Sequence, residues 1–517
     1  MNTRKNYLSL RGMKRRSNLP NSIHHLGDYF AALVMTIHFL FFFSPQKIFS
    51  QTNFRIFPSS ITQTEPIIAV HPTNPLIMFA SAVTINTQNG FKSEGIYVST
   101  NGGLNWFGSD SCKGNSIVNH GGDPGIVIHP NGNFILTHIG SVFQGVYSHY
   151  STNFGASWSN AFTISSSQPE DKGTTTLDDV PTSLYYGKIY TAYVNFTTPY
   201  PVMFSNSIDT GKNWSTPFAI NNSPPSRCSG GNIKTGKNGE VFICWSGMTS
   251  AFPLIEDYCG FAVSTNGGTS FSVTPNIFDM NGINGTLPTK NNIRVNGLPQ
   301  LAVDKSNSAR SGWLYIVTIE KNLSPAGSDA DIILHRSSDN GASWSSGIRV
   351  NQDAVNNGKI QYFPAMAIDS SGGVNIIFVD DRNTSSDSAE IMLARSTDGG
   401  NTFSERVIST HRFQPKSIAG GPSNYQGDHI AVTTIGNSLH AFWMDDFSGL
   451  YQIWTAIVEL NPNGIKEVGN DVPKNFSLEQ NYPNPFNPTT NFRFQISDFG
   501  FVILKVYDIS GKEVATL

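Results

Sequence analysis

An eight-residue turn motif occurs six times along this chain of 517 residues. Its copies fit Ser-x-Asp/Asn-x-Gly-x-Asn/Ser/Thr-Trp/Phe and begin at Ser99, Ser151, Ser207, Ser264, Ser337 and Ser396. Each follows an alternating run such as "GIYVS" or "IMLARS", which is typical of a strand. The Asp or Asn can accept N–H bonds within a turn, the Gly allows positive φ, and the aromatic residue starts a returning strand. The chain is therefore expected to consist of repeated β-hairpins.

The motif resembles the Asp-box, or BNR repeat, of sialidase-like β-propellers. Upstream of the copies lies a second recurring pair of strand-like runs, as in "EPIIAVHP" and "FPAMAIDSSGGVNIIFVDDR". We expect four strands per unit, with the Asp-box joining the third strand to the fourth. The copies are spaced by 52 to 73 residues, which suits one propeller blade with variable loops. The predicted fold class is an all-β, sialidase-like β-propeller over residues 51–460.

The number of blades depends on the end of this region. The segments "GDHIAVTTIGNSLHAFWMDD" and "YQIWTAIVEL" predict three more strands without an Asp-box. The N-terminal "NFRIFPSS" could supply the fourth strand and close the ring, which would leave no free sheet edge. We therefore favour seven blades. The alternative is six blades, as in the well-known sialidases, with an appended hairpin.

The segments on either side of the predicted propeller suggest export. Residues 1–50 have signal-peptide layout: a basic start, the apolar run "AALVMTIHFLFFF" and a polar end. That run has 13 residues, whereas a membrane span needs about 20, so we expect no stable membrane span. Residues 461–474 read as a polar linker. Residues 475–517, with "FSLEQNYPNPFNPTTNFRFQIS", resemble the first half of a type A sorting domain of the type IX secretion system, a partial β-sandwich.

Several classes of function are not expected from the composition. Formal net charge is −3, and no basic run occurs outside the first 16 residues, which argues against nucleic acid as a partner. No cofactor motif was found. A zinc site is not expected because no C-x-x-C pair occurs. Cys244 and Cys259 could lie opposite each other on neighbouring strands and form a disulfide, and buried free thiols are the alternative.

Propeller geometry indicates where a ligand would bind. The first-to-second and third-to-fourth turns share one face, and the resemblance implies that the binding site lies on the other. We assigned to that face the residues just before each first strand and just after each second strand. They are Glu65, Asp123, Asp178, Asp179, Glu320, Asp380, Asp381, Asp428, Asp445, Asp446, Arg227, Arg294, Arg382 and Arg412. Ten carboxylates against four arginines predict an acidic rim.

Resemblance to sialidases implies three arginines for a sugar carboxylate, a tyrosine nucleophile with a glutamate partner, and an aspartate as acid and base. Within "FRIFP", Arg55 matches the first arginine of the family's F/Y-R-I-P motif, with Phe57 as an insertion. The cluster "DDR", Asp380 to Arg382, could serve acid–base chemistry on a glycoside or fasten neighbouring blades. The tentative catalytic residues are Arg55, Asp123, Asp380, Asp381 and Arg382.

The sequence thus favours a secreted or cell-surface protein, exported through the general pathway and the type IX machinery, that engages glycans or other surface polymers without ordinary sialidase activity. An active sialidase or other glycoside hydrolase is one alternative. A protein-interaction propeller is another, because fold does not decide function.

Overall fold

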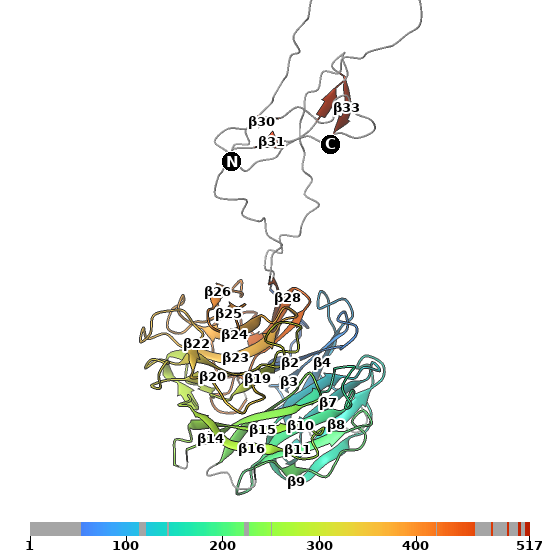
Figure 1. Cartoon of the computed structure of the whole chain (residues 1–517), viewed down its shortest axis with the longest axis vertical. Helices are drawn as coiled ribbons and strands as arrows, with labels where there is room; N and C mark the ends of the chain where they lie inside the picture. Colours follow the sequence, from blue (N-terminus) through green and yellow to red (C-terminus); the bar gives the residue numbers. More distant parts are fainter. Residues whose placement is uncertain are drawn as a thin grey trace, which may run out of the picture. The chain divides into compact units, whose positions relative to one another are not determined.

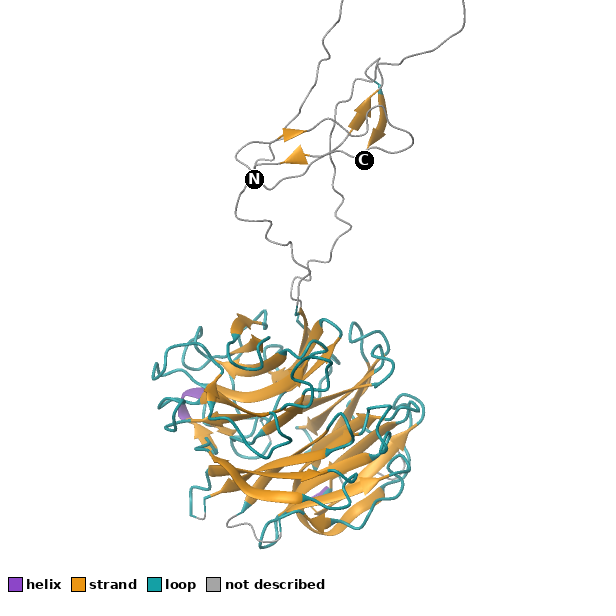
Figure 2. Ribbon diagram, viewed as in Figure 1, coloured by secondary structure: helices purple, strands orange, loops and turns teal. Residues whose placement is uncertain are grey.

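The computed structural model describes residues 53–460, apart from 113–119, 142–143, 222–226, 250 and 420, together with tail residues 477–478, 494–495, 505–507 and 512–516. Gln51–Leu460 form one compact unit. This unit consists of strands and loops, with the short 3-10 helix η2, Pro288–Lys290 (Figures 1 and 2). The predicted signal peptide and linker lie outside the described residues.

Four-stranded sheets recur through this unit, each made of strands that follow one another in the chain. The first is β2(Thr62–Val70), β3(Met78–Asn86), β4(Phe91–Ser99) and β5(Phe107–Ser109). Next are β6(Gly122–Ile128), β7(Phe134–Ile139) and β8(Gln144–Ser151), followed by β9(Phe162–Leu177), β10(Ile189–Asn195), β11(Val202–Ser207) and β12(Phe218–Ala219). These seven strands form one sheet, because the N-terminal half of β9 pairs with β8 and its C-terminal half pairs with β10. The long strand β9 therefore closes one four-stranded unit and opens another.

The remaining sheets repeat the pattern. They are β13(Cys228–Thr235), β14(Val241–Met248), β15(Glu256–Ser264) and β16(Ser272–Asp279); β19(Gln300–Val303), β20(Leu314–Glu320), β21(Asp331–Ser337) and β22(Ile348–Arg349); and β23(Gln361–Ile368), β24(Val374–Asp380), β25(Glu390–Ser396) and β26(Ser404–Val407). A small hairpin, β17(Gly285–Leu287) and β18(Ile293–Val295), precedes β19.

The last sheet contains the N-terminal strand. It consists of β27(Ala431–Ile435), β28(Ser438–Asp445), β29(Gln452–Glu459) and β1(Phe54–Arg55). Phe54 pairs with Thr455, and Arg55 pairs with Trp454. The prediction that "NFRIFPSS" supplies the missing fourth strand is confirmed.

The first strands of successive units contact one another in a closed sequence, β2, β6, β9, β13, β19, β23, β27 and again β2. A ring of radially arranged sheets results, which is the architecture of a β-propeller. Many of the second and third strands are almost wholly buried, because both of their faces pack against neighbouring sheets.

The six Asp-boxes form equivalent turns between third and fourth strands. Their glycines, at positions 103, 155, 211, 268, 341 and 400, all have φ between 76° and 89°. In every box the glycine N–H donates to the hydroxyl of the first serine, for example from Gly341 to Ser337 at 2.9 Å. The Asp or Asn then accepts N–H bonds from the end of the box, as Asp339 does from Ser343 at 2.9 Å. The predicted hairpin role of the motif is confirmed.

Of the two alternatives for Cys244 and Cys259, the structure has the buried free thiols and not the disulfide. Strands β14 and β15 are antiparallel neighbours, as expected, but Cys244 pairs with Phe261 and Cys259 pairs with Ser246. The register is offset because the two cysteines are not equidistant from the turn between the strands. All four cysteines are buried free thiols.

The described part of the tail contains two pairs of short strands, β30(Ser477–Leu478) with β31(Phe494–Gln495), and β32(Lys505–Tyr507) with β33(Glu513–Thr516). Across the residues that the structure describes, no helix has the length and apolar character needed to cross a membrane.

Candidate functional site at the mouth of the ring

Strand direction alternates within each sheet, so the Asp-boxes and the first-to-second turns lie on one face of the ring. The starts of the first strands and the ends of the second strands lie on the opposite face. Two of the predicted rim residues are therefore misplaced. Asp178 and Asp179 follow β9 and precede β10, in a turn closed by a 2.9 Å hydrogen bond from the Asp178 N–H to the Lys188 carbonyl. They belong to the Asp-box face, because β9 extends through two sheets and its end is a first-to-second turn.

Four residues meet at the centre of the opposite face, and we call this group the central mouth. Arg294, on β18, donates to Asp428 through Nε at 3.3 Å and through Nη2 at 2.5 Å. Its guanidinium carbon lies 5.0 Å from the centre of the Tyr425 ring. The Tyr425 hydroxyl in turn donates to Oε1 of Glu65 at 2.9 Å. Residues far apart in the sequence thus form one polar network around the axis of the ring.

Charge and burial differ sharply within the central mouth. Tyr425 and Glu65 are buried, whereas the side chain of Arg294 is 43% exposed. Burial, together with the nearby carboxylates of Glu65 and Asp428, raises the pKa of Tyr425 well above its usual value. The tyrosine is therefore a neutral hydrogen-bond donor at neutral pH. The central mouth presents the Arg294–Asp428 ion pair to solvent, with Arg294 as its more exposed member.

The hairpin β17–β18 brings Arg294 to the mouth and is fastened on both sides. Lys290 Nζ is fully buried and donates to Asp381 at 2.6 Å. The Asn296 side chain donates to the Asp428 carbonyl at 3.1 Å, and the Gly297 N–H donates to Glu256 at 2.7 Å. The position of Arg294 is therefore set by several bonds outside its own ion pair.

A cavity of about 130 Å³ lies on the axis, lined by the first strands. Its lining includes Pro66–Ile68, Asp123–Pro124, Gly173–Thr175, Gly230–Lys234, Leu298–Leu301, Ala365–Met366 and His429–Val432. Asp123, a tentative catalytic residue, has φ +52° at a bulge where the pairing of β6 with β7 shifts. Glu65 and Phe363 have the same backbone form, and a proline follows each of the three. The position of Asp123 is thus a repeated feature of the first strands.

The predicted "DDR" cluster connects neighbouring elements. Asp380 accepts from the N–H and Nε of Arg382 at 2.7 and 2.8 Å, and Arg382 donates two bonds to Glu405 on the outermost strand β26. Asp381 accepts from Lys290 and from the Ile360 N–H at 2.7 Å. Burial raises the pKa of Asp380 to about 6, although Arg382 opposes that shift. The three residues do not join the central mouth, and their contacts fit the fastening role.

Arg55 lies on β1, the outermost strand of its sheet, with its guanidinium 5.9 Å from the centre of the Trp454 ring. Two strands, β28 and β29, separate β1 from the first strand β27. Arg55 is therefore at the outer edge of the ring rather than at the central mouth. The F/Y-R-I-P match could not locate it, because the N-terminal strand closes the last sheet here.

The exposed charge on this face differs from the predicted acidic rim. Six of the eight predicted rim carboxylates that lie on this face are buried: Glu65, Glu320, Asp380, Asp381, Asp445 and Asp446. Many of them accept bonds from basic groups or N–H groups; for example, Asp445 contacts His411 at 2.9 Å and Trp443 at 2.6 Å. By contrast, the side chains of Arg412 and Lys416 are 62% and 54% exposed. The predicted acidic rim is therefore wrong. Most of the carboxylates that were counted are buried or paired, so they add little negative charge to the surface.

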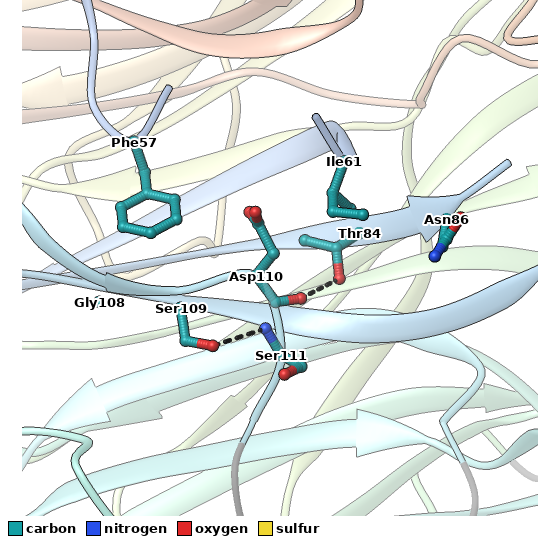
Figure 3. Close-up of a pocket in the computed structure, with 8 residues that line it drawn as sticks. All are labelled: Phe57, Ile61, Thr84, Asn86, Gly108, Ser109, Asp110 and Ser111. Atoms are coloured by element: carbon teal, nitrogen blue, oxygen red, sulfur yellow. Dashed lines mark hydrogen bonds between the residues drawn. The ribbon is translucent and has the colours of Figure 1, made fainter. Parts of the chain in front are cut away.

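A larger cavity, of about 440 Å³, lies near the end of β3, between the first sheet and the N-terminal segment. Figure 3 shows the Phe57 ring and the side chains of Ile61, Thr84 and Asp110 around it. Asp110 Oδ1 accepts from the buried Tyr97 hydroxyl at 2.7 Å, and the Asp110 carbonyl accepts from Thr84 at 2.7 Å. Phe57 packs against Tyr97 with ring centres 5.3 Å apart. An aromatic ring beside fixed polar groups is a common arrangement in ligand pockets.

Sequence reasoning missed Tyr425, and it also missed four polar residues between the first two sheets, Glu94, His120, His138 and His149. Tyr425 comes after the last Asp-box in "GPSNYQGDHI", and only the nearby Asp428 attracted attention. The four polar residues are spread over 56 positions without a recognisable spacing. Both groups can be recognised only in the folded structure, where the ring brings their segments together.

Comparison with known proteins supports the fold. No protein-family model matches the chain, and no curated protein is similar to it in sequence. A PL25 polysaccharide lyase, an ulvan lyase, shares the fold with a TM-score of 0.51 and 11% identity, over 79% of this chain and 96% of that one. The same figures hold for a structure of that lyase bound to -[GlcA(1-4)Rha3S]-. A Hadza microbial sialidase gives a TM-score of 0.41 at 13% identity, over 75% of each chain. The chain is thus similar in fold to a carbohydrate-active enzyme along nearly the whole length of that enzyme.

Proposed function

We propose that residues 51–460 form a seven-bladed, sialidase-like β-propeller that binds an anionic polysaccharide across the face opposite the Asp-boxes. The blade count rests on the seven four-stranded units, including the one that β1 completes. The polysaccharide is suggested by the fold shared with an ulvan lyase, one structure of which holds a uronate linked to a sulfated sugar. The proposed ligand therefore carries carboxylate or sulfate groups.

The observation that carries this proposal is the exposure of Arg294 at the central mouth. The guanidinium is held by Asp428 and stacked on Tyr425, but 43% of the side chain remains exposed. Nε and Nη2 already donate to Asp428, so a carboxylate or sulfate of the ligand would accept from the remaining N–H groups, on Nη1 and Nη2. Arg412 and Lys416 add exposed positive charge on the same face. Lys416 is paired with Asp446, and Arg412 lies 3.9 Å from Glu390, but both side chains remain more than half exposed, which suits a repeating polyanion.

We also propose that the chain does not release sialic acid from simple sialosides. A sialidase needs several arginines around one carboxylate, and here Arg55 and Arg382 are engaged at outermost strands. Arg227 is stacked over Phe196 at 4.3 Å and Tyr200 at 5.5 Å. Among the described residues, Arg294 is the arginine that contacts the Tyr425–Glu65 pair directly.

One observation favours cleavage as a second candidate function. The Tyr425–Glu65 hydrogen bond has the residue types of the sialidase nucleophile and its partner, in which a tyrosine replaces the usual carboxylate. If the chain hydrolyses a glycoside, Tyr425 would transfer its proton to Glu65 and attack the anomeric carbon as the glycosidic C–O bond breaks, with the leaving oxygen taking a proton from water. The hydroxide so formed would then release the sugar from Tyr425, whose oxygen recovers the proton from Glu65. Tyr425→Phe would then abolish turnover.

Export is proposed from the sequence. The signal-peptide layout of residues 1–50 and the resemblance of residues 475–517 to a type IX sorting domain support a secreted or cell-surface location, with the type IX machinery as a partner.

The proposed function can be tested with the full chain. Binding to a sulfated uronan and to a neutral glucan would be compared by calorimetry, and the same samples would be assayed with aryl sialosides and other aryl glycosides near pH 6. We expect binding to the uronan alone and no release of sialic acid. Equal affinity for the uronan and the neutral glucan would contradict the proposal that the ligand is anionic. Turnover of an aryl glycoside that Tyr425→Phe abolishes would establish the second candidate instead.

A further inference from the structure

A second polar cluster lies between the first two sheets, away from the central mouth. It consists of Glu94 on β4, His120 just before β6, and His138 and His149 on β7 and β8. Glu94, His120 and His138 each offer one ligand atom, and these atoms lie within 4.8 Å of one another. Their side chains are 0%, 5% and 1% exposed. The search for C-x-x-C spacing could not detect such a group, because its members come from different strands.

One buried oxygen of the Glu94 carboxylate lacks a hydrogen-bond partner among the described residues. Glu94 Oε2 contacts His120 Nδ1, but Oε1 is buried and accepts no hydrogen bond from any residue that the structure describes. Nδ1 of His138 lies 4.0 Å from Oε1, beyond hydrogen-bond distance. His120 compensates the carboxylate at Oε2 only, and a buried carboxylate oxygen without a hydrogen bond is unfavourable, so a cation beside Oε1 would satisfy it.

The hydrogen bonds of His138 and His149 also indicate a place for a cation. His138 Nδ1 lies 2.8 Å from the Ile139 carbonyl, and His149 Nδ1 lies 3.2 Å from the Ser159 carbonyl. Carbonyl oxygens only accept, so both Nδ1 atoms carry protons, and in neutral rings both Nε2 atoms have lone pairs. These Nε2 atoms are 3.1 Å apart, where two lone pairs repel each other. A positive charge shared by the two nitrogens removes the conflict.

We propose that Glu94, His120 and His138 bind a divalent transition-metal ion, with Nε2 of His149 as the fourth ligand. Imidazole and carboxylate ligands suit zinc, with bonds of about 2.0–2.2 Å. Two nitrogens on one tetrahedral zinc lie about 3.3 Å apart, close to the 3.1 Å between the two Nε2 atoms. The backbone carbonyls that hold both Nδ1 atoms match the outer hydrogen bonds usual for zinc-binding histidines.

The ion would join two sheets of the ring. Glu94 belongs to the first sheet and the histidines to the second, so a bound metal replaces a buried conflict by four bonds across the boundary. The ligand atoms of Glu94, His120 and His138, which lie within 4.8 Å of one another, would draw together to about 3.3 Å on binding. With four protein ligands the site has the closed form of a structural zinc site, so it adds stability rather than chemistry. It does not depend on the proposed polysaccharide.

The test uses the full chain after removal of metals with a chelator. Zinc alone is added, unbound metal is removed, and metal content is measured by mass spectrometry. Cobalt is then used as a spectroscopic probe of the ligands. We expect one zinc per chain, a tetrahedral cobalt absorption spectrum, and a higher melting temperature with zinc than without. If the wild-type chain does not retain about one zinc per chain, the proposed metal site is rejected.

Variants identify the ligands. Glu94→Gln keeps the size of the side chain, and His120→Ala removes the most accessible ligand; each should lose the bound zinc. His335→Ala is the matched control, because His335 is buried 3.7 Å from Glu320 in a comparable pair that no third ligand joins among the described residues. The control should keep one zinc. Retention of zinc by both Glu94→Gln and His120→Ala would place the metal elsewhere and reject the proposal. If a variant does not fold, the zinc content and cobalt spectrum of the wild type decide.

Discussion

The Tyr425 hydroxyl donates a 2.9 Å hydrogen bond to Oε1 of Glu65, a residue 360 positions earlier in the chain. Glu65 lies on the first strand of the first sheet, and Tyr425 lies just before the first strand of the last sheet. The bond therefore spans the boundary at which the ring closes. Thr64 adds a second link there, because its hydroxyl donates to the Gln426 carbonyl.

Replacing Tyr425 by Phe removes this bond and little else. We expect the free energy of unfolding to fall by about 1.5 to 3 kcal/mol, the usual range for a hydrogen bond to a charged group. Urea unfolding measures the change. Tyr186→Phe is the control, because that side chain is 38% exposed, and it should shift stability by less than about 0.5 kcal/mol. Equal effects would mean that the Tyr425 hydroxyl is bonded to water instead.

Gly341 tests the packing of the Asp-boxes. Its φ is +86°, and a Cβ there would lie 2.2 Å from a ring carbon of Phe261. Gly341→Ala should cost about 3 kcal/mol, from left-handed strain and a steric clash together. Gly132 has φ +88° with open space around it, so Gly132→Ala should cost only about 1 kcal/mol. Denaturant melts of the two variants separate strain from packing, and similar losses would show that the box glycine does not touch the core.

The strands were predictable because each Asp-box carries its own turn chemistry within eight residues. The closing strand was predictable for a different reason: the last sheet lacked a fourth strand, and an unpaired sheet edge must be covered. Surface charge was not predictable, because it depends on which carboxylates are buried. Asp380 and Asp445, for example, look identical to exposed aspartates in the sequence and are 0% exposed in the fold.

The central mouth and the histidine cluster could not be found for a related reason. Each is assembled by the ring from segments far apart, such as Arg294 with Asp428 and Glu94 with His138. Their residue spacings are set by loop lengths, which carry no fixed pattern. The misplacement of Asp178 has a different source: β9 serves two sheets without a break, so no turn signal marked the boundary.

Glu170 gives a pH-dependent contribution to stability. It is 1% exposed, and burial raises its pKa to about 7 although Ser165 donates a 2.6 Å bond to it. The folded state therefore keeps this proton between about pH 4.5 and 7, whereas the unfolded chain has released it. Stability from this group is fully present below about pH 4.5 and is lost as the pH rises through 7, by an amount on the order of 3 kcal/mol.

Glu170→Gln tests this directly, because the amide has the same shape and does not titrate in this range. The difference in unfolding free energy between variant and wild type should change steadily from pH 4.5 to pH 7 in favour of the variant. Glu459→Gln offers a control at a carboxylate that already accepts from Ser438 at 2.8 Å near the surface. A difference that stays constant across this range for Glu170→Gln would show that its carboxyl group is hydrated in the folded protein.

The last prediction concerns the charge that the mouth face presents to a ligand. Arg412 is 62% exposed and lies 3.9 Å from its nearest carboxylate, Glu390, so Arg412→Ala should leave stability within about 0.5 kcal/mol of the wild type. Affinity for a sulfated uronan should nevertheless fall several-fold, because an exposed cation is lost from the face of the ring that bears the central mouth. Lys212→Ala removes the same charge from an exposed residue of an Asp-box, on the opposite face, and should leave the affinity unchanged. Equal losses of affinity for the two variants would mean that the polymer binds by overall charge, without preference for the mouth face.

Calorimetric titrations at about 0.1 M and 1 M salt should also show weaker binding at the higher concentration, where the screening length falls from about 10 Å to 3 Å.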